Sequence, residues 1–235
     1  FRSIRKPRVA FLPTGSELVP VGTELKRGQN FDTNSLMAAQ LIRDMGGEPF
    51  IHPIVRDDLD TLQTVLSQML ESADIVIVNA GTSKGGEDYG TRLLDTEGTL
   101  LFHGVAAVPG RPMSMAVIHN TPVVNLSGPT FACFYSMDWA VRAMVCRFLG
   151  IDIPKRKTVR AVLTKPLRSP PVLSVMMSVK LEQREDGRLL ATPLSLRGPG
   201  AVGAAAALTA DAVYVTRLGG EQYDAGSVIE VELLH

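Results

Sequence analysis

The stretch DIVIVNAGTSKGGEDY, residues 74–89, decides the fold of this chain, because an apolar run passes directly into a polar loop rich in glycine. Residues 75–78 are all β-branched, and a continuous β-branched run is typical of a strand buried on both faces of a sheet. Ligands of open parallel sheets bind beyond the carboxyl ends of such strands. The loop therefore lies where a binding site is expected.

The composition of this loop favours the binding of a phosphate group. Its glycines expose a run of backbone N–H groups, and the hydroxyls of Thr82 and Ser83 stand beside an expected helix start. The glycine spacing is neither that of a P-loop nor that of the dinucleotide-binding fingerprint, so ATP hydrolysis is not indicated.

Strands and helices alternate on both sides of the loop. Helix 58–72 carries leucines and methionines at three- and four-residue spacings, and Gly46-Gly47 ends the helix before it. The alternation predicts an α/β domain whose parallel sheet has helices on both faces. The predicted elements are strand 8–12, helix 34–45, strand 49–55, helix 58–72, strand 75–78, helix 89–96, extended segments 100–105, 115–118 and 122–126, and a long helix 130–149.

The pattern changes after Gly150, where residues 153–157 read Ile-Pro-Lys-Arg-Lys. We expect an α/β domain at 1–153 and a small C-terminal β domain, a barrel or a sandwich, at 154–235. Glu185-Asp186-Gly187 predicts a hairpin turn. The alanine-rich residues 198–208 fit either a short helix or a close-packed loop. The predicted strands of this domain are 158–164, 172–183, 188–193, 212–217 and 227–233.

Composition excludes several classes of protein. Lysine plus arginine and aspartate plus glutamate number 24 each. No net electrostatic field therefore favours the binding of nucleic acid or of an acidic membrane surface. No apolar stretch approaches the length of a membrane span, and no signal-peptide core follows residues 1–6. Cys133 and Cys146 would lie about 20 Å apart on one helix, which predicts free, buried thiols in a reducing compartment. We expect a cytoplasmic chain. Because it starts at Phe1 and enters a strand almost at once, we also expect a piece of a longer protein.

Acidic residues follow each of the first three predicted strands. Glu17 follows the first, Asp57 and Asp58 follow the second, and Asp88 follows the third. Carboxylates crowded at one sheet edge are tolerated when a hard cation such as magnesium neutralises them, and the same site then holds an oxyanion or a phosphate. We predict Glu17, Asp57 and Asp88 as ligands of Mg²⁺. Alternatively, Glu17 is an ordinary surface or capping acid, and the two aspartates only cap the next helix.

Two later turns supply further candidates for anion binding. Gly110 and Arg111 lie in a proline-flanked turn, where Arg111 is either the best placed cation or an ordinary surface arginine. Ser127, Gly128 and Thr130 open the long helix and resemble an anion-binding N-terminus. The histidines show no metal-ligand spacing and no serine lies in a Gly-x-Ser-x-Gly elbow, so a structural zinc and nucleophilic catalysis are both unsupported.

Taken together, these motifs resemble the MoeA/gephyrin E-domain family, which completes molybdenum cofactor synthesis. The resemblance covers nearly the whole chain, and its motifs occur in the family's order. The matching segments are 14–18 (TGSEL), 28–34 (GQNFDTN), Asp57-Asp58, 79–88 (NAGTSKGGED), 108–112 (VPGRP), 198–208 and 225–231 (AGSVIEV).

The resemblance implies a function and its site. Glu17, Asp57, Asp58 and Asp88 would surround magnesium and molybdate, and the glycine loops would hold the pterin phosphate or its adenylated form. Adenylate would leave while the dithiolene captures molybdate. A homodimer is also implied, with a site completed by an N-terminal domain of the partner, and no nucleic acid or membrane takes part. The residues implied to bind the cofactor are Thr14, Gly15, Gly81, Thr82, Ser83, Gly85, Gly110, Arg111, Ser127 and Gly128.

The chain departs from the family pattern at four places. Ser16 stands where the family has aspartate, and Val108 and Arg111 stand where lysines are usual. Residues 126–130 read LSGPT in place of LPGNP. Two alternatives to an enzyme therefore stay open. One is a non-catalytic pterin-binding or carrier module, and the other is a scaffold protein with an exposed apolar patch.

Overall fold

The computed structural model describes residues 4–80, 89–194 and 209–234. It divides into two compact units. The first comprises Phe1–Val105 and Pro112–Ile153, and the second comprises Ala106–Arg111 and Pro154–His235. The short segment Ala106–Arg111 thus belongs with the C-terminal unit, although the sequence placed it in the α/β domain.

The first unit is built on a six-stranded sheet in the order β4-β1-β5-β9-β8-β6. Strands β4 (Glu48–Ile51), β1 (Arg8–Thr14), β5 (Ile75–Ala80) and β9 (Thr121–Ser127) are parallel, as predicted. Strands β8 (Ser114–Ile118) and β6 (Thr99–His103) run antiparallel at one edge. The sheet is therefore mixed. The physical reason is the two-residue turn His119-Asn120, whose positive φ values of 48° and 67° join β8 and β9 as a hairpin.

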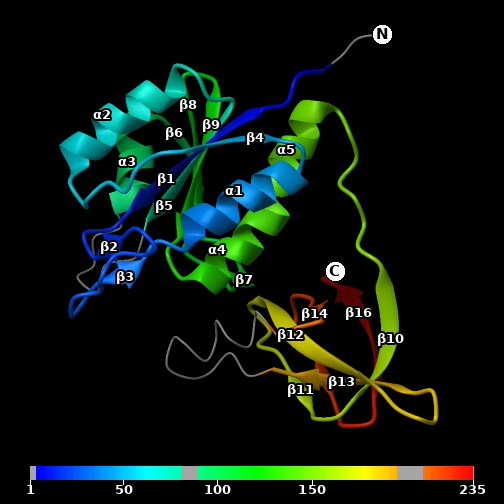
Figure 1. Ribbon diagram of the computed structural model, residues 1–235. Helices are drawn as coiled ribbons and strands as arrows, with labels where there is room; N and C mark the ends of the chain where they lie inside the picture. The colour runs from blue at the N-terminus through cyan, green and yellow to red at the C-terminus, as the bar shows by residue number, and fades with distance from the viewer. Residues whose placement is uncertain (1–3, 81–88, 195–208, 235) are drawn as a thin grey trace. The chain divides into compact units, whose positions relative to one another are not determined.

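Helices cover both faces of this sheet, as Figure 1 shows. One face carries α1 (Asn34–Asp44) and a helical segment of three parts: α4 (Thr130–Ser136), the π-helical turn η1 (Met137–Val141) and α5 (Arg142–Leu149). The other face carries α2 (Leu59–Leu70) and α3 (Tyr89–Glu97). The single long helix predicted at 130–149 thus contains a π turn, which no periodicity signalled. A short parallel pair, β2 (Leu18–Val19) with β3 (Asn30–Phe31), was not predicted.

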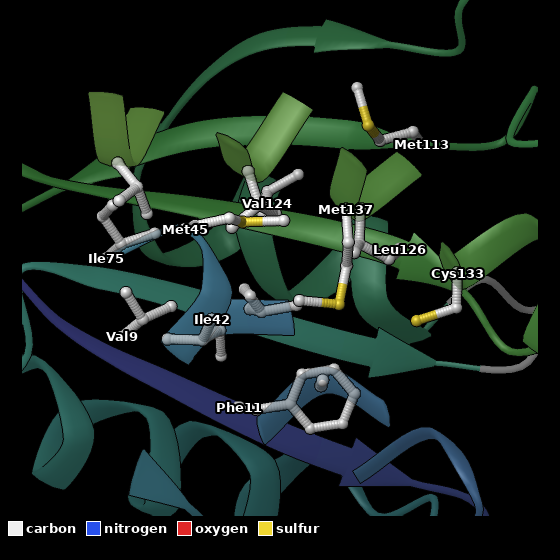
Figure 2. Packing of buried hydrophobic residues seen from close by; sticks show 14 residues of the cluster. Val9, Phe11, Ile42, Met45, Ile75, Met113, Val124, Leu126, Cys133 and Met137 are labelled. Atoms are coloured by element: carbon white, nitrogen blue, oxygen red, sulfur yellow. The ribbon is translucent and has the colours of Figure 1, made fainter. Parts of the chain in front are cut away.

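Strand residues alternate between two cores. Val9 and Phe11 of β1 pack with α1 and α4, whereas Ala10 and Leu12 pack with α2 and α3. In Figure 2 the side chains of Val9, Phe11, Ile42 and Met137 gather in the first of these clusters. Both faces are therefore apolar, which explains the uninterrupted apolar runs in the sequence.

The predicted free thiols are confirmed. Cys133 in α4 and Cys146 in α5 are both buried and unpaired. Within the described residues, no helix has the length and apolar character needed to cross a membrane.

The second unit is a closed five-stranded barrel. Its strands are joined in the ring β10-β13-β12-β14-β16, with β16 returning to β10. The predicted turn at 185–187 joins β12 and β13, with Gly187 at φ 82°. Residues 198–208 lie outside the described part. The elements are β7 (Ala107–Val108, paired with β12), β10 (Thr158–Leu163), β11 (Leu167–Arg168, paired with β15), β12 (Ser174–Gln183), β13 (Leu189–Pro193), β14 (Ala212–Val215), β15 (Gln222–Tyr223) and β16 (Val228–Leu233).

The predicted fold class, an α/β domain followed by a small barrel, is confirmed. Five strands that bury one face around Val179, Ala212 and Val231 make a sufficient core for the small unit.

Candidate functional site at the carboxyl edge of the sheet

The carboxyl ends of β1, β5 and β9 lie side by side. Thr14 pairs with Ala80, and Ala80 pairs with Ser127, so the three strands end in one row. A cleft of about 540 Å³ opens at this edge. Its described lining residues are Thr14, Glu17, Leu18, Asn30, Phe31, Asp32, Thr33, Asn34, Asn79, Gly128, Pro129 and Thr130.

Two buried amides connect three segments of this edge. Asn79 of β5 donates through Nδ2 to the carbonyls of Leu126 (3.2 Å) and Ser127 (2.9 Å). Asn34, the first residue of α1, donates through Nδ2 to Asn79 Oδ1 (2.8 Å) and to the carbonyl of Gly128 (2.6 Å). The amide pair therefore holds β5, α1 and the turn after β9 together. Neither asparagine was predicted as a site residue, although Asn34 lies in the segment 28–34 and Asn79 in the segment 79–88 that carried the resemblance.

Several buried polar atoms of this edge keep unused hydrogen-bonding capacity. Among the described residues, Thr14 Oγ1, Asn34 Oδ1 and Ser127 Oγ have no hydrogen-bond partner. Thr14 is 1% exposed, Asn34 7% and Ser127 6%. Because an unsatisfied buried polar group costs about 1–3 kcal/mol, their concentration at one edge indicates a place where a ligand or solvent completes the bonding.

Glu17 lies in a tight turn after β1. Gly15 donates to the carbonyl of Val55 (3.0 Å) and accepts from the N–H of Leu18 (3.1 Å). The backbone of Gly15 has a φ of 154°, which favours glycine, and a Cβ there would lie 2.8 Å from Glu17 Oε2. Glu17 thus lines the cleft, as predicted for this sheet edge.

Asp32 is a further acid of the cleft that sequence analysis did not select. Its carboxylate accepts from the backbone N–H of Ser35 (3.0 Å) and from the Ser35 hydroxyl (2.5 Å), and so satisfies a backbone N–H in the first turn of α1, whose N-cap residue is Thr33. Burial raises the pKa of the nearby Cys133 thiol to about 12, and the negative charge of Asp32 adds to the shift. The available signal was its position directly before a predicted helix.

Asp57 and Asp58 have different partners. Asp58 caps α2, and hydrogen bonds from the hydroxyl and the N–H of Thr61 lower its pKa. Asp57 accepts from the backbone N–H of Ser16 (3.2 Å), and its own N–H donates to the Ser16 hydroxyl (3.3 Å). The capping interpretation therefore holds for Asp58. Asp57 instead connects the loop after β4 to the loop after β1 through two hydrogen bonds. Both are made with Ser16, which is one of the departures from the family pattern.

The described residues contain no group of three or more histidine, cysteine, aspartate or glutamate side chains able to hold a metal ion. Glu17 and Asp57 are described, but the predicted third ligand is not. Five predicted site residues lie outside the described residues: Gly81, Thr82, Ser83, Gly85 and Asp88.

Gly110 and Arg111 belong to the second unit, together with β7. Within that unit β7 pairs with β12 through Ala107 and Val108. The sequence placed both residues on the sheet of the α/β domain because 108–112 falls between two of its strands. The pairing of β7 with the barrel joins residues 67 positions apart, such as Ala107 and Ser174, and has no local signal.

The start of α3 is fixed by close packing. A Cβ at Gly90 would lie 2.2 Å from Asn125 Oδ1, so a larger residue would displace the helix from β9. Beside it, the hydroxyls of Thr91 and Ser114 lie 2.9 Å apart in a buried polar contact. The helix start that follows residues 81–88 is therefore held against β8 and β9.

Comparison with known proteins agrees with this geometry. A family model described as "Probable molybdopterin binding domain" matches residues 14–146, and one described as "MoeA C-terminal region (domain IV)" matches residues 160–234. A molybdopterin biosynthesis MoeA protein from Pyrococcus horikoshii has a similar structure, with a TM-score of 0.80 and 29% identity over 97% of this chain and 54% of that one.

Curated relatives are named molybdopterin molybdenumtransferases. The molybdopterin molybdenumtransferase of Bacillus subtilis is 27% identical over 232 residues, which are 98% of this chain and 53% of the relative. That of a Nostoc species is 36% identical over 150 residues, 62% of this chain and 34% of the relative. The chain thus spans about half the length, or less, of these relatives. Because the two family models together cover both units in order, the chain belongs to the MoeA family.

Proposed function

We propose that this chain is the molybdopterin-binding part of a molybdopterin molybdenumtransferase, acting in molybdenum cofactor biosynthesis. Its reaction would insert molybdate into adenylated molybdopterin and release AMP. The names of the relatives and the two family models support this proposal. The observation that carries it is the cleft beside Thr14, Asn34 and Gly128, at the sheet edge where ligands of such folds bind.

In this proposal the residues of the sheet edge bind and orient the substrates. Thr14 and Ser127 offer buried hydroxyls, and Gly15 and Gly128 let the backbone approach a ligand closely. Asn34 and Asn79 keep the turn after β9 in place while the ligand is bound. Glu17, Asp57, Asp58 and Asp88 keep their predicted catalytic roles, with Asp58 capping α2 at the same time.

Magnesium is a separate part of the proposal. Carboxylate oxygens suit a hard cation, but the described residues do not form a complete cation site by themselves. Glu17 and Asp57 would need Asp88 or a substrate oxygen to complete it, so we assign no catalytic step to the metal. Titration with magnesium followed by calorimetry tests this part, and binding that is unchanged in Asp57→Asn would contradict it.

Two further parts rest on the resemblance. The protein would form a homodimer, which sedimentation velocity checks, and it would act in the cytoplasm.

Arg111, if it contacts the substrate, would supply the positive charge that lysine supplies in the family, with a planar guanidinium in place of an ammonium.

An anaerobic calorimetric titration with adenylated molybdopterin tests the main proposal. Thr14→Val keeps the side-chain volume and removes the hydroxyl, and we expect it to weaken binding about tenfold, which corresponds to about 1.4 kcal/mol. Ser136→Ala is the matched control. Ser136 also has a buried hydroxyl without a partner among the described residues, but it lies in α4 and does not line the cleft. Absence of binding by the folded, unmodified protein would refute the proposal.

A scaffold function is the second candidate, and one observation favours it. Beside the first cleft, a second one of about 670 Å³ has apolar walls that include Val21 and Leu36. Val21 is 54% exposed and Leu36 63%. A scaffold would use such a surface for protein contacts. The double substitution Val21→Ser and Leu36→Ser should leave pterin binding unchanged if the protein is an enzyme, and should abolish partner binding if it is a scaffold.

A further inference from the structure

A further cavity of the first unit lies at the amino edge of the sheet, at the opposite end of β5 from the candidate site. We call it the amino-edge cavity. Its volume is about 610 Å³, which lies within the range of small-molecule sites. Ile75, the first residue of β5, lines it, whereas Asn79 lines the cleft at the carboxyl edge, about 13 Å further along the strand. A ligand of the amino-edge cavity would therefore be separate from the ligand of the proposed function.

The walls of the amino-edge cavity are mainly apolar. Side chains of α5 form one wall, and side chains from the starts of β5 and β9 and from β8 form the others. Two of them are thioethers, which adapt to the shape of a ligand and contact aromatic rings favourably. The ligand must therefore present an apolar body. The apolar lining residues that matter here are Ile75, Met115, Pro122, Ala143, Met144 and Phe148.

Asp74, the one acid among the lining residues, already has partners. Its carboxylate accepts from both terminal nitrogens of Arg5 (2.6 Å each) and from the backbone N–H of Arg8 (2.7 Å). These bonds, chiefly those from Arg5, lower the pKa of Asp74. The Arg5 guanidinium also lies 5.3 Å from the centre of the Phe148 ring, in cation–π contact. Asp74 is thus neutralised by Arg5, and the same arginine supports the aromatic wall.

Arg147 is the one basic residue among the lining residues, and its charge is not compensated. Its guanidinium makes no ion pair within the part of the chain that the structure describes. Outside that part only Glu87 and Asp88 have acidic side chains. They directly precede α3, whose Gly90 packs against Asn125 near the carboxyl end of β9, whereas the cavity lies at the amino end of that strand. Arg147 therefore offers its positive charge to a ligand.

We propose that the amino-edge cavity binds a small apolar monocarboxylate. The carboxylate of this ligand pairs with Arg147, and its apolar body packs against Phe148 and the thioethers of Met115 and Met144. Arginine binds a carboxylate through two parallel N–H···O bonds, which fixes the orientation of the ligand. A neutral ligand of the same shape would lose this pair, and a small polar acid would gain nothing from the walls.

The test compares an acid with its neutral amide. Naphthylacetate and naphthylacetamide have the same ring, and only the first carries a charge. In an NMR titration of protein with isotopically labelled methionine methyl groups, we expect naphthylacetate to shift the resonances of Met115 and Met144. It should bind about tenfold more tightly than the amide, because a hydrogen bond to a charged group is the stronger one. Acetate at the same concentration should leave both resonances unchanged. The variants Met115→Leu and Met144→Leu assign them.

Two variants locate the ligand, and a third is the matched control. Arg147→Gln should weaken the binding of naphthylacetate about tenfold and remove its preference over the amide. Ala143→Leu fills the cavity and should abolish the binding of both. Arg43→Gln is the control, because Arg43 lies in the last turn of α1 as Arg147 lies in that of α5, but it does not line the cavity. Both arginine variants lose the same interaction with a helix dipole, and Arg43→Gln should bind the acid normally.

Three outcomes would overturn the proposal: no shift of the two methionine resonances, equal affinity for the acid and the amide, or unchanged binding in Arg147→Gln. Saturating adenylated molybdopterin should leave the binding of naphthylacetate unchanged. Displacement of the acid would place it at the carboxyl edge and would also overturn the proposal. The amino-edge cavity does not depend on the proposed function, since failure of adenylated molybdopterin to bind would refute that function alone.

Discussion

Strands β5 and β16 have six residues each and differ in how they are buried. All six residues of β5 are buried, whereas in β16 the buried Ile229 and Val231 alternate with exposed neighbours. The reason is the surroundings, since helices cover both faces of the sheet and only one face of each barrel strand meets a core. A strand buried on both faces can present polar groups only at its end, so the chemistry of the first unit concentrates at the carboxyl edge.

The barrel distributes its polar groups differently. Ion pairs such as Arg168–Asp224 (2.6 Å) and Lys180–Asp211 (2.9 Å) lie on its surface, with substantially exposed side chains. Exposed pairs of this kind contribute little to stability. The comparison therefore predicts that substitutions of buried residues in the sheet unit cost more stability than substitutions on the barrel surface.

The largest expected effect concerns a strand interior. Ile77→Ala in β5 removes a fully buried side chain and should lower the free energy of unfolding of the first unit by about 2–5 kcal/mol. Val228→Ala on the outer face of β16 should change it by no more than about 0.5 kcal/mol. Urea denaturation combined with amide hydrogen exchange reports on each unit. Similar losses in both variants would contradict the comparison.

The second effect concerns polar contacts. Asn34→Leu removes the NH₂ group that satisfies Asn79 Oδ1 and the Gly128 carbonyl, at a cost of about 1–3 kcal/mol for buried groups left unsatisfied. Thr192→Val removes the hydrogen bond to Thr164 (2.8 Å) on the barrel surface, and water replaces it. We expect a loss below about 1 kcal/mol there. The same denaturation experiment measures both variants. A larger loss of unfolding free energy for Thr192→Val than for Asn34→Leu would contradict the comparison.

The third effect is pH dependence of the first unit. Burial raises the pKa of Cys133 from 9.0 to about 12, so above pH 9 the unfolded chain loses a proton that the folded chain keeps. The stabilisation is complete below pH 9 and is lost as pH rises toward 12, with a slope of about 1.4 kcal/mol per pH unit. Between pH 8 and 10 the first unit should lose stability, and Cys133→Ala should remove this dependence.

The barrel provides the reference for that measurement, since it contains no cysteine. Burial and the neighbouring Tyr223 raise the pKa of Tyr214 above its ordinary value of 10, so its contribution declines only at higher pH. A thiol reagent at pH 8 should leave Cys133 unmodified until the protein unfolds. Rapid labelling of Cys133 in the folded protein would show that its burial is overstated.

Local sequence predicted most of the fold. Periodicity found the sheet strands and helices of the first unit within a few residues, because apolar spacing reports which faces are covered. The turn at 185–187 was predicted because its glycine fits a positive φ. The π turn at Met137–Val141 was missed because it leaves no periodic signal, and the extended segments 100–105 and 115–118 were predicted without their antiparallel direction.

The site was predicted less completely. Position after a strand selected Thr14, Glu17 and Gly128, which line the cleft, and Ser127, which ends β9 at the same edge, because strand ends of a parallel sheet share one edge. It did not identify Asp32, Asn34 or Asn79, since a polar residue at a helix start looks like an ordinary cap and Asn79 was predicted at the start of a loop, whereas β5 extends to Ala80. Capping of α2 was predicted for either aspartate, and only the structure assigned the cap to Asp58 and the contact with Ser16 to Asp57.

The sequence by itself determined the α/β class, the small β domain that follows it and the sheet edge where a site is expected, because the buried residues of each strand and helix recur with the period of that element. Only the tertiary structure decided which side chains meet at that edge. The amide pair of Asn34 and Asn79 joins residues 45 positions apart, and its orientation is set by backbone carbonyls of a third segment. Hydrogen bonding of this kind depends on direction and distance, which residue spacing does not encode.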